Sequence, residues 1–433
     1  MTIYDYIVSA DGSYQTNVLS AGQPDGTGAS IVDGTKTTTV VGSVGQLISR
    51  TTVDIASSIT NASEIYSNYD EFQRPRHVVY LDGTSEDVNY ACCGLDNTTD
   101  RDGVTTQYWY DDLKRLVATT RLNVTTTNIL DAAGNVLATK RIGSDNSQIT
   151  LRQAAYDVAG RLVLETNALN GVTSYTNIFD GSGQTVKTNT YPDGGTRIET
   201  YYQDGALSEV GGTAAQPMRY LYGVETDTQS PDYRRPSTYE IRLTAAASPT
   251  GTNEWTRTFT DMLGRTYKTV YSKVSAPYPY SQSFYNTLGQ VWKQTDPEGV
   301  ITLYQYNAKG ELEYTALDTN RNNTIDFSGT DRITRTVNDV LYNSTYGVNV
   351  RRSQTYAYVT DNASTSLLIA KQETSTDGLR SWQTQYRSPV APVVTQTQTQ
   401  YNMNDGVSAA GYRTVTVTQP DTSKIVTVYP LVA

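Results

Sequence analysis

Residues 318–331 are the one stretch of this sequence whose residue types and spacing suit a metal ion. Ca²⁺ prefers oxygen ligands, and alternate residues of a tight loop can direct their oxygens at one point. Oxygen donors occupy every second position here, at Asp318, Asn320, Asn322, the Thr324 carbonyl and Asp326. Asn323 stands where glycine is usual and Gly329 where a bidentate Glu belongs, although Asp331 could replace that Glu. The segment predicts a weak structural Ca²⁺ site, with an Asx-rich turn satisfied by its own backbone as the alternative.

Residues for other chemistry are scarce. The chain has one histidine, His77, and two cysteines, Cys92 and Cys93, whereas zinc sites draw on several such residues. Adjacent cysteines form a disulfide only under strain, because neighbouring Cα atoms lie about 3.8 Å apart and disulfides prefer about 4.4 Å or more. Reduced and oxidised forms both stay open. The sequence holds no Gly-x-Ser-x-Gly elbow, phosphate loop or dinucleotide fingerprint, so we expect no enzyme activity.

One short phrase recurs along the chain: an aromatic or apolar residue, Asp or Asn, two variable residues and Gly, often followed by Arg or Gln. The Asp or Asn of each copy is Asp70, Asp111, Asp131, Asp157, Asp180, Asp261, Asn286 or Asn307. The glycine is clear at Gly160, Gly183, Gly264, Gly289 and Gly310. Repeated acids could suggest a catalytic carboxylate pair, but a residue copied once per unit serves that unit. We therefore predict a structural role in turns for all of them.

A second phrase, Asp, Asn or Glu before Gly and then Thr, lies between many copies, as at residues 102–108, 170–175 and 297–302. Asp or Asn at the start of a turn accepts backbone N–H bonds from the residues that follow, and Gly three positions later supplies a positive φ. The segments between turns are rich in Tyr, Thr and Val, which favour strands. We expect an all-β fold, a succession of antiparallel hairpins in a long ribbon that must coil or close because sheets twist.

The alternation of Tyr-Asp-x-x-Gly-Arg with Asp/Glu-Gly-x-x-Thr-x-Tyr resembles the YD repeat of Rhs proteins, teneurins and insecticidal Tc toxin components. The resemblance is clearest over residues 66–345. It implies a β-sheet ribbon that spirals into a hollow shell in secreted or cell-surface proteins, some of which enclose a C-terminal toxin. The self-cleaving Rhs core phrase is absent, since residues 296–299 form an ordinary turn followed by another repeat. We expect no toxin domain after residue 345.

The clarity of the repeat suggests three parts. Residues 1–60 are expected to form a diverged N-terminal β segment, residues 61–345 the YD-repeat ribbon, and residues 346–433 a C-terminal β segment continuous with it. In the last part, residues 396–401 and 413–418 alternate at the strand period of two.

Composition limits the partners. The chain has 34 Lys and Arg against 44 Asp and Glu, a formal net charge of −10, which works against binding nucleic acid or an anionic membrane surface. No apolar run approaches the roughly 20 residues needed to span a bilayer. The first residues lack the basic region and apolar stretch of a signal peptide, so the expected extracellular or cell-surface location follows from the resemblance alone.

Three functions stay open. The first, which we favour, is a non-enzymatic structural or scaffold protein outside the cell that assembles into oligomers or fibres, because the edges of an open ribbon pair readily with another copy. The second is a cell-surface adhesin or glycan-binding module, because Tyr rings can stack on sugars while their hydroxyls bond to them. The third is a fragment of a toxin-enclosing Rhs shell.

Overall fold

The protein is built from strands joined by turns. The computed structural model describes residues 1–91, 94–243, 252–273, 277–358, 361, 365–386, 392–402 and 412–430. All regular elements among these residues are strands, which confirms the all-β prediction. No helix long and apolar enough to cross a bilayer occurs in this part of the chain.

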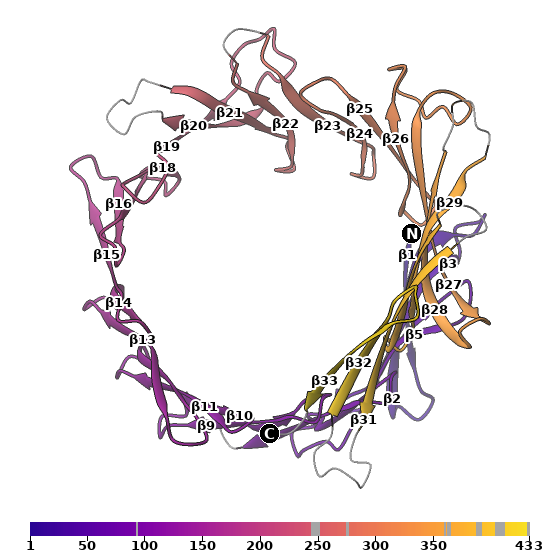
Figure 1. Cartoon of the computed structure of the whole chain (residues 1–433), viewed down its shortest axis with the longest axis horizontal. Helices are drawn as coiled ribbons and strands as arrows, with labels where there is room; N and C mark the ends of the chain where they lie inside the picture. Colours follow the sequence, from indigo (N-terminus) through magenta and orange to yellow (C-terminus); the bar gives the residue numbers. More distant parts are fainter. Residues whose placement is uncertain are drawn as a thin grey trace. The chain divides into compact units, whose positions relative to one another are not determined.

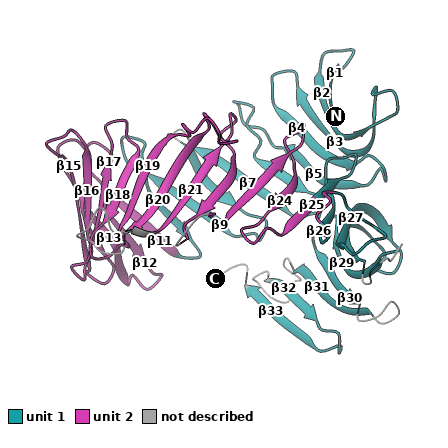
Figure 2. Cartoon of the chain, turned by 90° about the horizontal axis from the view of Figure 1, so that it is seen from above, with its two compact units in different colours: residues 1–123, 304–320, 324–433 teal, residues 124–303, 321–323 magenta. Residues whose placement is uncertain are grey.

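The chain divides into two compact units. Unit 1 comprises residues 1–123, 304–320 and 324–433, and unit 2 comprises residues 124–303 and 321–323 (Figure 2). Segments from both halves of the sequence therefore meet in unit 1. These units do not test the predicted division into residues 1–60, 61–345 and 346–433, which was based on how regular the repeat is. That division stays a prediction.

The strands of unit 1 come from three stretches of sequence. The first ten are β1 (Thr2–Val8), β2 (Tyr14–Pro24), β3 (Ile31–Gly42), β4 (Leu47–Asp54), β5 (Thr60–Ser67), β6 (His77–Tyr80), β7 (Ser85–Ala91), β8 (Gly94–Thr99), β9 (Thr105–Tyr110) and β10 (Leu116–Arg121). The later ones are β26 (Leu312–Asp318), β27 (Arg332–Asn343), β28 (Val348–Ala357), β29 (Leu367–Ser375), β30 (Arg380–Tyr386), β31 (Pro392–Asn402), β32 (Tyr412–Thr418) and β33 (Lys424–Pro430).

Unit 2 holds most of the regular repeats. Its strands are β11 (Val124–Leu130), β12 (Val136–Ile142), β13 (Gln148–Tyr156), β14 (Leu162–Asn167), β15 (Val172–Phe179), β16 (Thr185–Thr190), β17 (Thr196–Tyr201), β18 (Leu207–Gly211), β19 (Met218–Val224), β20 (Pro236–Leu243), β21 (Thr252–Thr260), β22 (Thr266–Tyr271), β23 (Tyr280–Tyr285) and β24 (Val291–Thr295). The strand β25 (Ile301–Tyr306) spans the boundary with unit 1.

The strands pair in chain order. Each strand forms an antiparallel ladder with the next one in sequence, from β1 to β10, from β11 to β25 and from β26 to β33, and the strands belong to one 33-stranded sheet (Figure 1). Within each of these three runs, the turns that follow odd-numbered strands therefore lie at one end of the strands, and those that follow even-numbered strands at the other. A β-bulge recurs where several repeat phrases begin, as between Ala155 and Tyr156. The succession of antiparallel hairpins expected from the sequence is confirmed.

Few side chains are fully buried. The largest fully buried side chains in the described part of unit 1 lie on β28–β30, where Val350 and Glu373 have no exposed surface and Trp382 retains 2%. The Tyr346 ring stacks on Trp382 with centroids 3.9 Å apart. Two side chains contact the Glu373 carboxylate inside this core: Lys371 Nζ lies 2.8 Å from its Oε2, and Asn343 Nδ2 donates to its Oε1 at 2.7 Å. This core belongs to the C-terminal part, where the sequence repeat is least regular.

Candidate functional site

The repeated Asp of the YD phrase accepts hydrogen bonds from residues of the turn in which it lies. In the turn between β13 and β14, the backbone N–H groups of Ala159 and Arg161 both donate to Asp157 Oδ1 at 2.9 Å. Arg161 Nε donates to the other oxygen at 2.7 Å, and Gly160 has φ 75°. The backbone hydrogen bond from Arg161, followed by the bond from its side chain, holds the pKa of Asp157 below its ordinary value. The carboxylate is thus kept ionised by the hairpin that it closes.

The other copies repeat this arrangement. In each, the side chain of the Asp or Asn accepts the backbone N–H four residues on, as seen at Asp70, Asp111, Asp131, Asp180, Asp261, Asn286 and Asn307. Gly183, Gly264, Gly289 and Gly310 all have positive φ, like Gly160. Gln73 and Lys114 occupy the glycine position in two copies and take φ 61° and 67°. The turn geometry therefore persists where the glycine is missing.

The predicted metal loop lies between β26 and β27. Asp318 and Asp331 are buried, each with 4% of its surface exposed. Asp331 ties the loop together, because it accepts the backbone N–H of Thr319 on Oδ1 and that of Asp326 on Oδ2, both at 3.0 Å. Asn320 Nδ2 donates to Asp326 Oδ2 at 2.5 Å. The Asp and Asn side chains of the loop thus bond to groups of the same loop, as in the Asx-rich turn named above as the alternative to a Ca²⁺ site.

The oxygen donors proposed for Ca²⁺ are Asp318, Asn320, Asn322, Thr324, Asp326 and Asp331, which all lie in the loop between β26 and β27 or at its two ends. Asn323, at the position where such loops use glycine, has φ 62°, which Asn tolerates. Within the described part of the chain, no group of three or more His, Cys, Asp or Glu side chains is placed to hold a metal ion. Calcium binding by this loop stays a prediction.

The structure places the one histidine on a strand, but it does not describe the two cysteines. His77 lies opposite Asp87 across β6 and β7, and its Nδ1 is 2.7 Å from Asp87 Oδ1. A cross-strand pair of this kind is what a sheet surface commonly uses. Cys92 and Cys93 lie outside the described residues.

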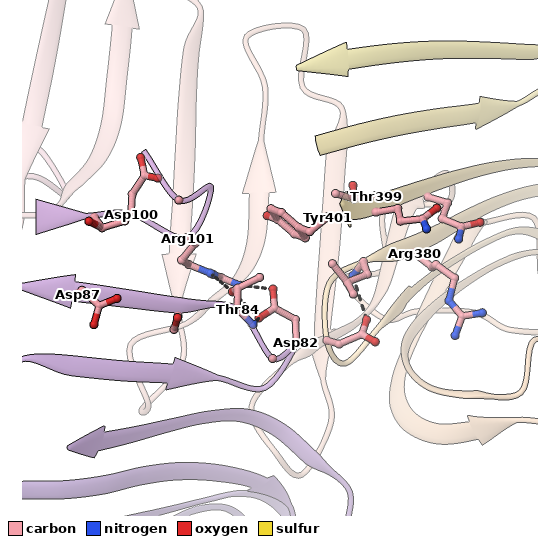
Figure 3. A pocket seen from close by; sticks show the side chains of 16 residues that line it. Asp82, Thr84, Asp87, Asp100, Arg101, Arg380, Thr399 and Tyr401 are labelled. Carbon is pink, nitrogen blue, oxygen red and sulfur yellow. Dashed lines mark hydrogen bonds and ion pairs between the residues drawn. The ribbon is translucent and has the colours of Figure 1, made fainter. Parts of the chain in front are cut away.

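A polar cavity of about 610 Å³ lies in unit 1 (Figure 3). Its walls are two turns of the N-terminal repeats, residues 82–85 and 100–103, together with residues 377–380 and residues 398–401 of β31. Sequence reasoning missed this cavity, because its walls are brought together only by tertiary contacts between segments that lie far apart in the chain.

Three charged side chains at the cavity, Asp82, Asp100 and Arg101, contact neighbouring groups. Arg101 forms an ion pair with Asp82, donates from Nε to Thr84 Oγ1 at 2.7 Å, and lies over the Tyr80 ring. Asp100 accepts the backbone N–H of Asp102 on Oδ1, and Arg121 Nη2 lies 2.5 Å from Asp100 Oδ2. These side chains hold the turns in shape.

Further side-chain contacts lie beside the cavity, one of them between segments far apart in the sequence. Arg413 on β32 donates from one nitrogen to both oxygens of Asp102, at 3.1 Å each. Asp377, in the turn before β30, accepts Ser375 Oγ at 2.5 Å and the backbone N–H of Leu379 at 2.9 Å. The arrangement is a set of interlocked turns with a polar recess between them.

The comparisons with known proteins concern the fold. No family model and no curated protein matches this sequence. Among solved structures, the TcdB2-TccC3-Cdc42 and TcdB2-TccC3 complexes each match with a TM-score of 0.43 and 12% identity, covering 99% of this chain and 27% or 28% of theirs. The Tc holotoxin pore of Photorhabdus luminescens matches with a TM-score of 0.39 and 11% identity, over 99% of this chain and 27% of that chain. This chain thus spans about a quarter of the length of the chains that it resembles.

Proposed function

We propose that this protein is a non-enzymatic YD-repeat scaffold that works outside the cell or at its surface and associates with further copies through the edges of its sheet. The observation that carries the proposal is the use of the repeated acids. Each Asp or Asn of the phrase accepts backbone hydrogen bonds within its own turn, as Asp157 does from Ala159 and Arg161. Repeated carboxylates that accept hydrogen bonds within their own turns close successive hairpins, and successive hairpins form an extended sheet.

The charged groups at the cavity and beside it support the same proposal. Asp82 and Arg101 pair with each other, and Asp102 is held by Arg413. Groups in such contacts stabilise the packing of the turns. A general base or nucleophile would need a free position beside a reacting group.

The edges of the sheet support association. In the described part of the chain, β1 pairs with β2 and β33 with β32, each along seven residues and without a bulge. Unpaired edge strands carry rows of N–H and C=O groups that readily bond to another strand.

Light scattering across a wide concentration range, combined with negative-stain microscopy, tests the assembly. We expect oligomers or fibres whose abundance rises with concentration. Monomers at every concentration would remove assembly from the proposal. Protease treatment of intact source cells tests the location, since a surface protein is cleaved and an internal one survives.

Two further functions have support of their own. The cavity is lined by Gln398, Thr399, Gln400 and Tyr401, and amide, hydroxyl and tyrosine groups of this kind favour a glycan-binding or adhesin role. A glycan array without a hit would weaken it. The YD phrase itself favours a fragment of a toxin-enclosing Rhs shell, which predicts toxin and immunity genes beside the gene for this chain.

A further inference from the structure

The strand β33 is unusual because it is apolar, uncharged in its centre and exposed. Ile425, Val426 and Val428 expose 59%, 55% and 56% of their surface, and Tyr429 exposes 43%. Lys424 and Pro430 stand at its two ends, so residues 425–429 carry no charge and no proline. Natural sheet edges are normally protected by a charge or a proline within the strand. In the described part of the chain, β33 pairs with β32 alone.

The backbone groups that β33 turns outward follow from its ladder. Gln419 donates its backbone N–H to Ser423 O at 2.8 Å, which makes these two residues a hydrogen-bonded pair at the turn. Hydrogen-bonded and non-bonded pairs alternate along an antiparallel ladder. Since Val417 lies opposite Ile425 and Val415 opposite Thr427, residues 425, 427 and 429 direct their N–H and C=O groups at β32. Val426 and Val428 therefore direct theirs away from the sheet.

This pattern is self-complementary. When two copies of β33 run antiparallel about an axis through Thr427, Val426 of one lies opposite Val428 of the other. Both residues have outward backbone groups, so these pairs can exchange their N–H···O bonds. Ile425 then faces Tyr429, and Thr427 faces Thr427, so no like charges meet.

The opposite edge, β1, is less suited to the equivalent pair centred on its middle residue. Ser9 donates its backbone N–H to Tyr14 O at 3.0 Å, and Ile7 lies opposite Thr16, so the same alternation leaves the outward groups of β1 at its even-numbered residues. An antiparallel pair of β1 strands centred on the middle residue would place Asp5 directly against Asp5. Like charges directly opposite each other destabilise a sheet.

We infer that β33 is the principal self-association surface, and that it joins two copies of this chain in a twofold antiparallel β33–β33 pair centred on Thr427. The inference rests on the proposed self-association and names its surface. A twofold interface closes on itself, so it gives a dimer as the basic unit. Assembly beyond the dimer then requires another surface.

Cysteine cross-linking tests the register, in a background with Cys92→Ser and Cys93→Ser. The central pair is a non-hydrogen-bonded one, with Cα atoms expected about 4.5 Å apart, which suits a disulfide. We expect Thr427→Cys to yield a disulfide-linked dimer under mild oxidation. Val426→Cys and Val428→Cys should cross-link weakly alone and strongly when mixed. If Thr427→Cys cross-links only when mixed with Asp5→Cys, the pairing is β33 with β1 and the twofold interface is wrong.

A charged substitution on β33 tests whether this strand, and not another surface, carries the self-association. Thr427→Lys places two ammonium groups face to face across the axis, and we expect the dimer to weaken at least roughly tenfold in sedimentation equilibrium. Thr2→Lys, which adds the same charge to exposed β1, serves as the control and should leave the dimer unchanged. Oligomers that survive Thr427→Lys would overturn the β33 surface and leave the proposed association standing. A parent chain that stays monomeric would overturn both.

Discussion

The glycine of the YD turn offers the clearest energetic test of the fold. Gly160 has φ 75°, and a Cβ added there would meet no atom within 4 Å. Substitution with Ala therefore introduces no clash with a neighbour, and its cost comes from the left-handed backbone, about 1–2 kcal/mol for a residue with a side chain. Ala also restricts the unfolded chain, which returns about 0.5–1 kcal/mol. We expect Gly160→Ala to destabilise the protein by about 1 kcal/mol.

Two comparisons make this prediction specific. Gly26 has no positive φ and also has open space around its Cβ position, so only the unfolded-chain effect remains and Gly26→Ala should stabilise the protein by up to about 1 kcal/mol. Lys114 occupies the glycine position of its turn at φ 67°, so Lys114→Gly should stabilise by up to about 1 kcal/mol. The assay is urea unfolding followed by tryptophan fluorescence and by far-UV circular dichroism. Equal stabilities for Gly160→Ala and Gly26→Ala would refute the assignment of a left-handed turn residue.

Three further predictions concern the core, the turns and the acidic loop. Trp382→Ala should cost about 3–5 kcal/mol because the ring is 2% exposed, whereas Trp109→Ala, at 53% exposed, should cost far less in the same unfolding assay. The pKa of Asp157 is lower than the usual 3.8, so its contribution to stability is present above that pH and is lost as pH falls through the folded value. Asp157→Asn should flatten that acid dependence and keep the turn, because Asn286 accepts the same backbone bonds from Leu288 and Gln290; acid titration of the unfolding midpoint checks this. Calcium at about ten times its dissociation constant should raise stability by about 1.4 kcal/mol, and Asp326→Asn should reduce that gain; an unchanged melting temperature with calcium and with chelator would contradict the predicted site.

The hairpins could be predicted because their causes are local. The Asp and Gly of each phrase close a turn within five residues, as Asp157 and Gly160 do, and the intervening β-branched residues favour strands. The copies with Gln73 and Lys114 carry no glycine signal, and their backbone reaches positive φ without it. There the hydrogen bonds of Asp70 and Asp111 hold the turn.

The packing between distant segments could not be predicted. Arg413 reaches Asp102 across 311 residues of sequence, and the local sequence around either residue gives no sign of the other. The buried set around Trp382 and Glu373 likewise lies in the part of the sequence with the least regular repeat. Long-range contacts depend on how strands stack in space, and the repeat phrase carries information only about the next turn.

Hydrogen–deuterium exchange read by mass spectrometry across residues 61–345 tests most directly whether each YD phrase is one hairpin of a continuous sheet. We expect short protected segments that coincide with the strands, interrupted by fast exchange at turns such as those of Asp131, Asp157 and Asn286. The backbone N–H four residues after each of these side chains should be the slowest within its turn. Long uninterrupted blocks of protection that ignore the phrase, or uniform fast exchange through it, would contradict a sheet built from one hairpin per phrase.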